Sequence, residues 1–156
     1  MKTNPKMDRA EYPIAKERLR LWLKLLKASS LIEDEIRRRL RAEFKSTLPR
    51  FDVMSALERA PDGLKMSEIS KRLRVSNGNI TGIVDKLTED GLALRVSVPG
   101  DRRANLIHLT PKGQKVFAEH AKTHEAWINE ILAELNKDDI EGMILRLDHL
   151  TKSLKE

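Results

Sequence analysis

The chain contains no cysteine among its 156 residues, and its aromatic side chains are few: two Trp, one Tyr and three Phe. The missing cysteine excludes disulfides, thiolate metal sites and cysteine nucleophiles, and it suits a reducing compartment. No apolar run approaches the roughly 20 residues that span a bilayer. The polar segment at residues 1–5 is not followed by the apolar core of a signal peptide. We therefore expect a soluble cytoplasmic protein that does not associate with a membrane.

Positive charge is concentrated near the N-terminus. Residues 1–50 carry 14 Lys or Arg against 7 Asp or Glu, whereas residues 51–110 carry 9 against 8. A basic balance favours a polyanionic partner such as nucleic acid, although a solvated basic helix accounts for it equally well. Any argument for nucleic-acid binding by residues 51–110 must therefore depend on where their few cations lie.

The apolar pattern predicts a mainly α-helical chain with one small β-hairpin, an α+β fold class. Helical spacing extends from Ala15 to about Lys45, with a possible break near Ser29-Ser30, and again from Arg50 to Arg59. Between them, Thr47-Leu48-Pro49 is predicted to end the first helix, since proline disfavours helix in the residue before it.

Two shorter helices follow. Ser67 is predicted to cap a helix that extends through Leu73, and Ser76 to cap one that ends near Asp90-Gly91, where glycine suits the position after a helix. The second of these helices should bury a stripe of Ile80, Ile83 or Val84, and Leu87.

After Gly91 the apolar residues recur at every second position instead of every third or fourth. Residues 92–98 alternate as in a half-buried strand, Pro99-Gly100-Asp101 supplies a turn, and Asn105–Leu109 returns as the second strand. Thr110-Pro111 opens a further helix from Lys112 to about Leu135. A last helix follows, capped by Asp138 or Asp139.

The outer helices have apolar faces that need a partner surface. A symmetric homodimer would supply one, and folding back onto the central unit is the alternative. We expect an N-terminal tail and dimerisation helix over 1–48, a central unit over 49–110 and C-terminal dimerisation helices over 111–156.

The helix after Ser76 is the candidate DNA-reading helix. Its first turns carry short hydrogen-bonding side chains of the kind that contact base edges and phosphates. These residues are Ser76, Asn77, Asn79 and Thr81. Gly78 and Gly82 each cost this helix about 1 kcal/mol relative to alanine, a cost that close approach to DNA would explain. The alternative is that residues 75–79 are a polar loop.

Arg102 and Arg103 follow the turn as candidate minor-groove probes, because a narrow minor groove concentrates negative potential that attracts arginine. Asp101 would be repelled by phosphate, so we expect it to accept hydrogen bonds from Arg103 and hold its guanidinium in one pose. A solvated charged turn is the alternative.

Helix, turn, helix and hairpin in this order resemble the MarR family of winged-helix transcription regulators, and the resemblance covers nearly the whole chain. The segments that carry it are Leu48–Val53, Met66–Ser70, Val75–Leu87, Asp101-Arg102-Arg103-Ala104 and Leu109-Thr110-Pro111-Lys112-Gly113. The resemblance implies a homodimeric repressor, without cofactor, that reads a pseudo-palindromic duplex. It implies that four residues, Ser76, Asn77, Asn79 and Thr81, lie where the reading helix meets the major groove. It also implies that Lys86 lies near phosphate and that Arg103 enters the minor groove, braced by Asp101. Many members have a longer polar or basic residue where this chain has Gly82.

The resemblance also implies an effector, commonly an aromatic carboxylate or its CoA thioester, bound between the dimerisation helices and the reading unit. The candidate lining residues are Trp22, Leu26, Leu40, Phe44, Phe51 and Met54. Each of them is also explained as ordinary core. The basic run Arg37-Arg38-Arg39 with Arg41 is a candidate for an anionic ligand tail, and a solvated helix face is its alternative.

Other classes of function have less support. His120 and His124 share a helix face, as zinc ligands require, with Glu33, Glu35 or Glu43 as further candidates for a metal-responsive regulator. No nucleophile elbow or phosphate-binding glycine loop points to an enzyme. A winged-helix protein–protein interaction module usually has an apolar patch where this chain has Asn and Thr.

Overall fold

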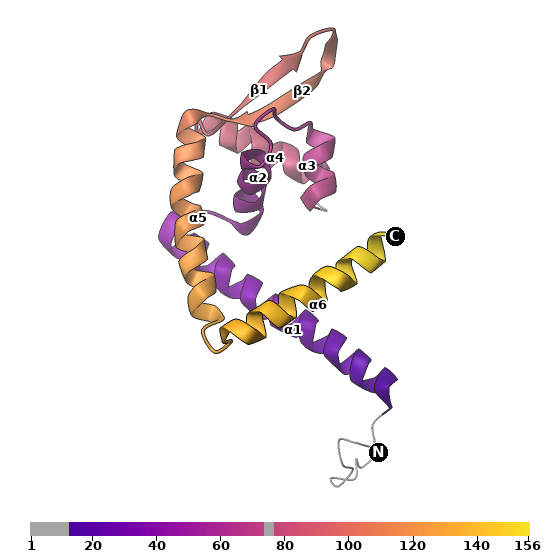
Figure 1. Cartoon of the computed structure of the whole chain (residues 1–156). Helices are drawn as coiled ribbons and strands as arrows, with labels where there is room; N and C mark the ends of the chain where they lie inside the picture. The colour runs from indigo at the N-terminus through magenta and orange to yellow at the C-terminus, as the bar shows by residue number, and fades with distance from the viewer. Residues whose placement is uncertain (1–12, 74–76) are drawn as a thin grey trace. The chain divides into compact units, whose positions relative to one another are not determined.

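A computed structural model describes residues 13–73 and 77–156, and the side chains of residues 77, 78, 102 and 103 lie outside that description (Figure 1). The chain divides into two compact units, Met1–Lys45 and Ser46–Glu156. Among the described residues no helix has the length and apolarity needed to cross a membrane. The predicted fold class is confirmed: the units are helical except for one antiparallel hairpin.

The described residues of the first unit form a single helix, α1 (Ile14–Phe44), of 31 residues. It ends at Lys45, whose φ of 49° is left-handed. The break considered near Ser29-Ser30 does not occur, because the helix contains neither proline nor glycine and serine costs a helix little. Ile36 and Leu40 are buried, whereas the apolar residues of its first half are exposed except for Leu25, which is half-buried.

The second unit begins with α2 (Leu48–Glu58). The prediction placed its start two residues later, at Arg50. The Thr47 side chain accepts a hydrogen bond from the Arg50 N–H at 3.2 Å, and Pro49 occupies the first turn. Proline is tolerated there because first-turn N–H groups have no partner within the helix. The same Thr-Leu-Pro segment that ends α1 in the prediction therefore begins α2.

Helix α3 (Met66–Leu73) begins one residue before the predicted cap. Ser67 lies inside the helix, so its assignment as N-cap is wrong. The Glu68 carboxylate instead accepts a hydrogen bond from the Lys65 N–H at 3.1 Å. An acidic side chain in the first turn therefore reaches back to the residue before the helix, as one half of a capping box does.

Helix α4 (Asn77–Glu89) ends as predicted. Gly91 has a φ of +75°, and the N–H groups of Gly91 and Leu92 donate to the carbonyls of Thr88 and Leu87 at 3.0 and 2.9 Å. This pair of bonds is the Schellman ending, which needs a left-handed residue after the helix. Ser76, the predicted cap at the other end, lies outside the described residues.

The hairpin consists of β1 (Ala93–Val98) and β2 (Asp101–Leu109). Its turn is Pro99-Gly100, with a Gly100 φ of +84°, and the register shifts beside Val98, which pairs with Asp101. The second strand is therefore four residues longer than predicted. Arg102 and Arg103 lie on β2 and not in the turn.

The alternation in β1 does not produce the half-buried face that was predicted. Leu94 and Val96 are 40% and 42% exposed, because the hairpin projects from the α2–α4 group and only its base packs on helices (Figure 1). At that base, Leu64 and Ile107 exchange two backbone hydrogen bonds at 3.1 and 2.8 Å. This bridge fixes the start of α3 to β2.

Helix α5 (Pro111–Ile131) begins as predicted: the Thr110 hydroxyl accepts a hydrogen bond from the Gly113 N–H at 3.0 Å. It ends four residues earlier than expected. Helix α6 (Lys137–Lys155) is capped by Asn136 and not by Asp138 or Asp139. Asp139 closes a reciprocal capping box, accepting from the Asn136 N–H at 3.1 Å.

The core of the second unit joins its helices to the base of the hairpin. Its most deeply buried side chains are Val53, Met54, Leu57, Leu64, Ile69, Ile80, Val84, Leu87, Ala93 and Ile107. The predicted buried stripe of α4 is confirmed: Ile80, Val84 and Leu87 are completely buried, and of the two alternatives for its middle position it is Val84 and not Ile83 that is fully buried. The opposite face of α4 is therefore held toward solvent.

Candidate nucleic-acid interface

The exposed face of α4 carries the predicted reading residues that the structure describes. Asn79 and Thr81 are exposed in its first turns. Ser76 lies outside the described residues, and Asn77 is described only as the first residue of the helix. Short hydrogen-bonding side chains on a helix whose other face is buried are suited to contact base edges.

Gly82 lies on the same exposed side of α4. A Cβ atom added there would meet no atom within 4 Å. Packing inside the described residues therefore does not require glycine at this position, although glycine costs a helix about 1 kcal/mol relative to alanine. The bare backbone is consistent with the close approach of another molecule.

Lys86, the predicted phosphate contact, is exposed in the last turn of α4. Its ammonium lies 3.7 Å from Glu89 and 3.8 Å from Asp90. Such exposed pairs contribute little to stability and are screened by salt. The lysine can therefore exchange these carboxylates for a phosphate at low cost.

An ion pair that the sequence analysis missed connects α4 to the β1–β2 hairpin, which we call the wing. Arg95 on β1 donates a hydrogen bond to the Asp85 carboxylate on α4. The two residues are ten positions apart, one on a helix and one on a strand, and no sequence pattern links them. Asp101 is exposed at the start of β2, and the side chains of Arg102 and Arg103 lie outside the description, so the proposed brace between Asp101 and Arg103 stays a prediction.

A second ion pair, also missed, joins α2 to the end of α4. The Arg50 guanidinium lies 2.8 Å from the Asp90 carboxylate, and both side chains are partly buried. The hydrogen bond from Arg50 lowers the pKa of the Asp90 carboxyl below its ordinary value of 3.8. Lys112 adds a hydrogen bond at 3.1 Å to the backbone carbonyl of Asp90. Residues from α2 and α5 thereby fix the end of the reading helix.

The six predicted effector-lining residues belong to different units. Trp22 and Leu26 are 54% and 44% exposed on α1, where Leu40 is buried and Phe44 half-buried. Phe51 and Met54 are buried on α2. The Phe51 ring lies 5.4 Å from Phe117 and 4.8 Å from His124, centroid to centroid.

The arginine run on α1 is paired within its own helix. Arg37 contacts Glu33 and Asp34, at 3.4 and 3.1 Å. Arg38 and Arg39 both contact Glu35, at 2.6 and 2.8 Å. These two hydrogen bonds lower the pKa of Glu35 to about 2. An anionic ligand tail would have to displace these carboxylates, so the solvated helix face explains the run better.

The histidine pair on α5 does not gather further ligands. Burial lowers the pKa of both His120 and His124 below 6.5. Within the described part of the chain, no group of three or more His, Cys, Asp or Glu residues is placed to hold a metal ion. His124 packs on Phe51 instead.

Comparison with known proteins agrees with this geometry. A family model described as "MarR family" matches residues 47–104, the segment from α2 to the wing. The transcriptional regulator PecS of Dickeya dadantii is 26% identical over 80% of this chain and 76% of its own length. YkoM of Bacillus subtilis, an HTH-type regulator, is 31% identical over 53% of this chain, and the alignment spans 54% of YkoM.

A solved MarR-family transcriptional regulator from Silicibacter pomeroyi is 29% identical, with a TM-score of 0.75 over 92% of this chain and 99% of that one. The chain matches the MarR family in sequence over residues 47–104 and resembles this solved member in fold over 92% of its length. It is a transcriptional regulator that binds DNA, and not an enzyme. Streptococcus pneumoniae FabT in complex with DNA shares the fold at 24% identity, with a TM-score of 0.71 over 88% of this chain and 97% of that one.

Proposed function

We propose that this MarR-family protein is a homodimeric repressor that binds a pseudo-palindromic operator and is released by a small aromatic carboxylate or its CoA thioester. The observation that carries the DNA-binding part is the polar, exposed face of α4 beside a wing that the Arg95–Asp85 pair ties to it. A buried stripe holds the other side of α4 in place.

In this proposal the beginning of α4 enters the major groove. Asn79 and Thr81 contact base edges or phosphates, together with Ser76 and Asn77 just before them. Lys86 lies near backbone phosphate at the other end of the helix. Bound phosphate would replace Glu89 and Asp90 as partners of its ammonium.

The wing reaches the neighbouring minor groove. Arg103 is the probe, Asp101 holds its guanidinium, and Arg102 contacts phosphate. Both arginines belong to β2, which begins directly after the Pro99-Gly100 turn, at the end of the hairpin that this role requires.

The direct test replaces Arg103 by alanine and measures affinity for an operator selected from a random duplex library. Arg103→Ala should weaken binding about tenfold at near-physiological salt. Arg146→Ala, on α6, is the matched control, since it removes the same charge far along the chain from the wing. Equal affinity of wild type and Arg103→Ala would refute the role of this arginine.

The homodimer is supported by two apolar helix faces. On α1, residues such as Leu19, Trp22 and Leu23 are more than half exposed. Helix α6 buries none of its residues, although Met143, Leu147 and Leu150 point the same way by helical spacing. Apolar faces of this extent in a chain of 17.9 kDa favour association with a second copy.

Sedimentation equilibrium tests this assembly. The wild type should sediment at twice the 17.9 kDa mass of one chain. Leu147→Glu on α6 should shift the population toward monomer, whereas the exposed, polar substitution Lys152→Gln should not. A monomeric wild type at micromolar concentration would overturn the proposal.

The effector is proposed from the family resemblance, with Trp22, Leu26, Leu40, Phe44, Phe51 and Met54 as candidate lining. Benzoate and benzoyl-CoA are suitable probes of the two chemical forms. Either should lower the affinity of the protein–operator complex in a dose-dependent way and raise the midpoint of thermal unfolding. No effect of either compound on either measurement would reject this effector class.

Activation is a second candidate, favoured by one comparison. A relative from Rhodopseudomonas palustris, named the transcriptional activatory protein BadR, is 27% identical over 78% of this chain and 70% of its own length. A reporter gene placed behind the selected operator distinguishes the two. Repression predicts higher expression when the regulator is removed, and activation predicts lower expression.

A further inference from the structure

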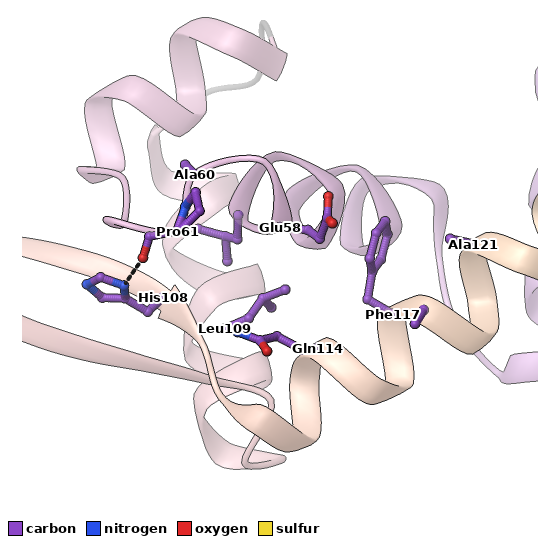
Figure 2. A pocket seen from close by; sticks show the side chains of 10 residues that line it. Glu58, Ala60, Pro61, His108, Leu109, Gln114, Phe117 and Ala121 are labelled. Carbon is purple, nitrogen blue, oxygen red and sulfur yellow. Dashed lines mark hydrogen bonds between the residues drawn. The ribbon is translucent and has the colours of Figure 1, made fainter.

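A pocket outside the proposed effector region lies where α2, β2 and α5 meet. Its volume is about 390 Å³, within the range of small-molecule sites. The apolar part of its wall includes Leu57, Leu109, Phe117 and Ala121 (Figure 2). None of the six predicted effector residues lines it.

The polar groups of the pocket are few, and one of them, His108, is held in position. His108 on β2 lies 3.2 Å through its Nδ1 atom from the carbonyl oxygen of Pro61. A carbonyl only accepts hydrogen bonds, so this Nδ1 carries the proton. Gly63 leaves room for the ring, since a Cβ atom there would lie 2.6 Å from His108 Nε2. The Gln114 amide on α5 supplies a donor and an acceptor.

The charge of the pocket is negative. Glu58 is its one acidic residue, and neither Lys nor Arg appears among the described residues that line it. Glu58 is exposed, and within the described residues it makes no ion pair. Figure 2 shows Glu58 on α2 and Phe117 on α5 among the residues that line the pocket. A carboxylate in the same wall as aromatic and aliphatic side chains suits an organic cation with an apolar body.

We propose that this pocket binds a small organic cation with an aromatic or aliphatic body, and that Glu58 selects its charge. The body packs against Phe117 and Leu109, and the cationic end pairs with Glu58. An aromatic carboxylate, the effector class proposed above, would meet a like charge here. The pocket is therefore a second site with the opposite charge preference.

The lining connects the wing to the helix that follows it. His108 and Leu109 are the last residues of β2, and Gln114 and Phe117 lie in the first turns of α5. A bound molecule contacts both elements and the end of α2 at once. Its binding is measured without DNA, so failure of this proposal leaves the proposed regulatory function untouched.

Three probes of similar size test it by isothermal titration calorimetry on the full chain: 2-phenylethylammonium, 3-phenylpropan-1-ol and 3-phenylpropionate. The wild type should bind the cation about fivefold more tightly than the alcohol, and the alcohol more tightly than the anion. Glu58→Gln keeps the shape of the side chain and should bring the three affinities within about twofold of one another. Glu125→Gln, an exposed acid on α5 outside the pocket, is the matched control and should keep the wild-type order.

A filling variant tests the location. Ala118 lines the pocket from the exposed side of α5, where leucine suits a helix. Ala118→Leu should weaken cation binding about tenfold, while circular dichroism shows the helical content unchanged. The proposal is overturned if the wild type binds no cation or binds cation and anion equally. It is equally overturned if Glu58→Gln keeps the order or Ala118→Leu keeps the affinity.

Discussion

A Cβ atom on Gly113 would lie 2.0 Å from the carbonyl oxygen of Leu92, closer than any side chain tolerates. The first turn of α5 therefore packs directly on the backbone that follows α4. Thr110 reinforces this junction, donating its hydroxyl to the Gly91 carbonyl at 2.7 Å and its N–H to the Leu92 carbonyl at 3.0 Å. The Leu-Thr-Pro-Lys-Gly segment thus joins the reading helix to α5.

Substitution of Gly113 should destabilise the protein strongly. Gly113→Ala places a methyl group against backbone that has no room to move, which we expect to cost about 3 kcal/mol in the free energy of unfolding. Urea denaturation measures it. A variant as stable as the wild type would show that α5 does not pack on Leu92 as described.

Gly82 should behave in the opposite way. Because a Cβ atom there meets open space, Gly82→Ala should raise the free energy of unfolding by about 1 kcal/mol through helix propensity. Gly82→Glu places a negative charge on the proposed DNA face and should weaken operator binding. Gly142→Glu on α6 is the control and should bind DNA like the wild type. If Gly82→Glu also binds normally, this face of α4 does not approach DNA.

Two positions at opposite ends of α4 should separate base reading from phosphate contact. Asn79→Ala should relax the preference among operator sequences, whereas Lys86→Ala should weaken all duplexes alike and flatten the dependence of affinity on salt by about one unit. Fluorescence anisotropy at several salt concentrations measures both. Identical profiles for the two variants would contradict this division of roles.

The Arg50–Asp90 pair should make stability depend on acid pH. The pKa of Asp90 is lower in the folded chain than its ordinary 3.8, so the unfolded chain binds the proton more readily. The contribution is therefore present above pH 3.8 and is lost as the pH falls through the lower, folded value. Asp90→Asn should be less stable than wild type at pH 7, and the difference should shrink below pH 3.8. A difference that persists unchanged to pH 2 would exclude the ion pair as its cause.

His124 on α5 should make the stability of the fold depend on pH in a higher range, below pH 6.5. Burial lowers the pKa of His124 below 6.5, so its neutral form stabilises the fold above pH 6.5 and this contribution is lost as the pH falls below that value. His124→Phe keeps a ring against Phe51 but cannot be protonated. It should lose less stability than wild type between pH 7 and 5 in urea titrations, whereas His149→Gln on α6 should follow the wild type.

Much of this arrangement could be predicted because it is encoded locally. The stripe of Ile80, Val84 and Leu87, the glycine ending of α4 and the Thr110 cap each depend on residues within a few positions of one another. The start of α2 was misplaced because Pro49 is compatible both with ending a helix and with opening one.

The contacts that could not be predicted join residues that are distant in the sequence. Arg50 and Asp90 are 40 residues apart, and no periodicity links them. The pocket around Glu58 combines three elements whose packing is known only from the fold. The exposure of Leu94 and Val96 was missed because alternation shows which residues share a face and not whether anything covers that face.

The central claim is that two copies of α4 and its wing read one duplex. Two reading helices in a dimer meet half-sites about 34 Å, or one helical turn, apart. The decisive measurement compares the selected operator with the same operator carrying five extra base pairs between its half-sites, which turns one half-site to the opposite side of the duplex. We predict tight, salt-dependent binding to the first and a loss of about 100-fold or more on the second. Equal affinity for both duplexes, or binding that does not change with salt, would contradict the account.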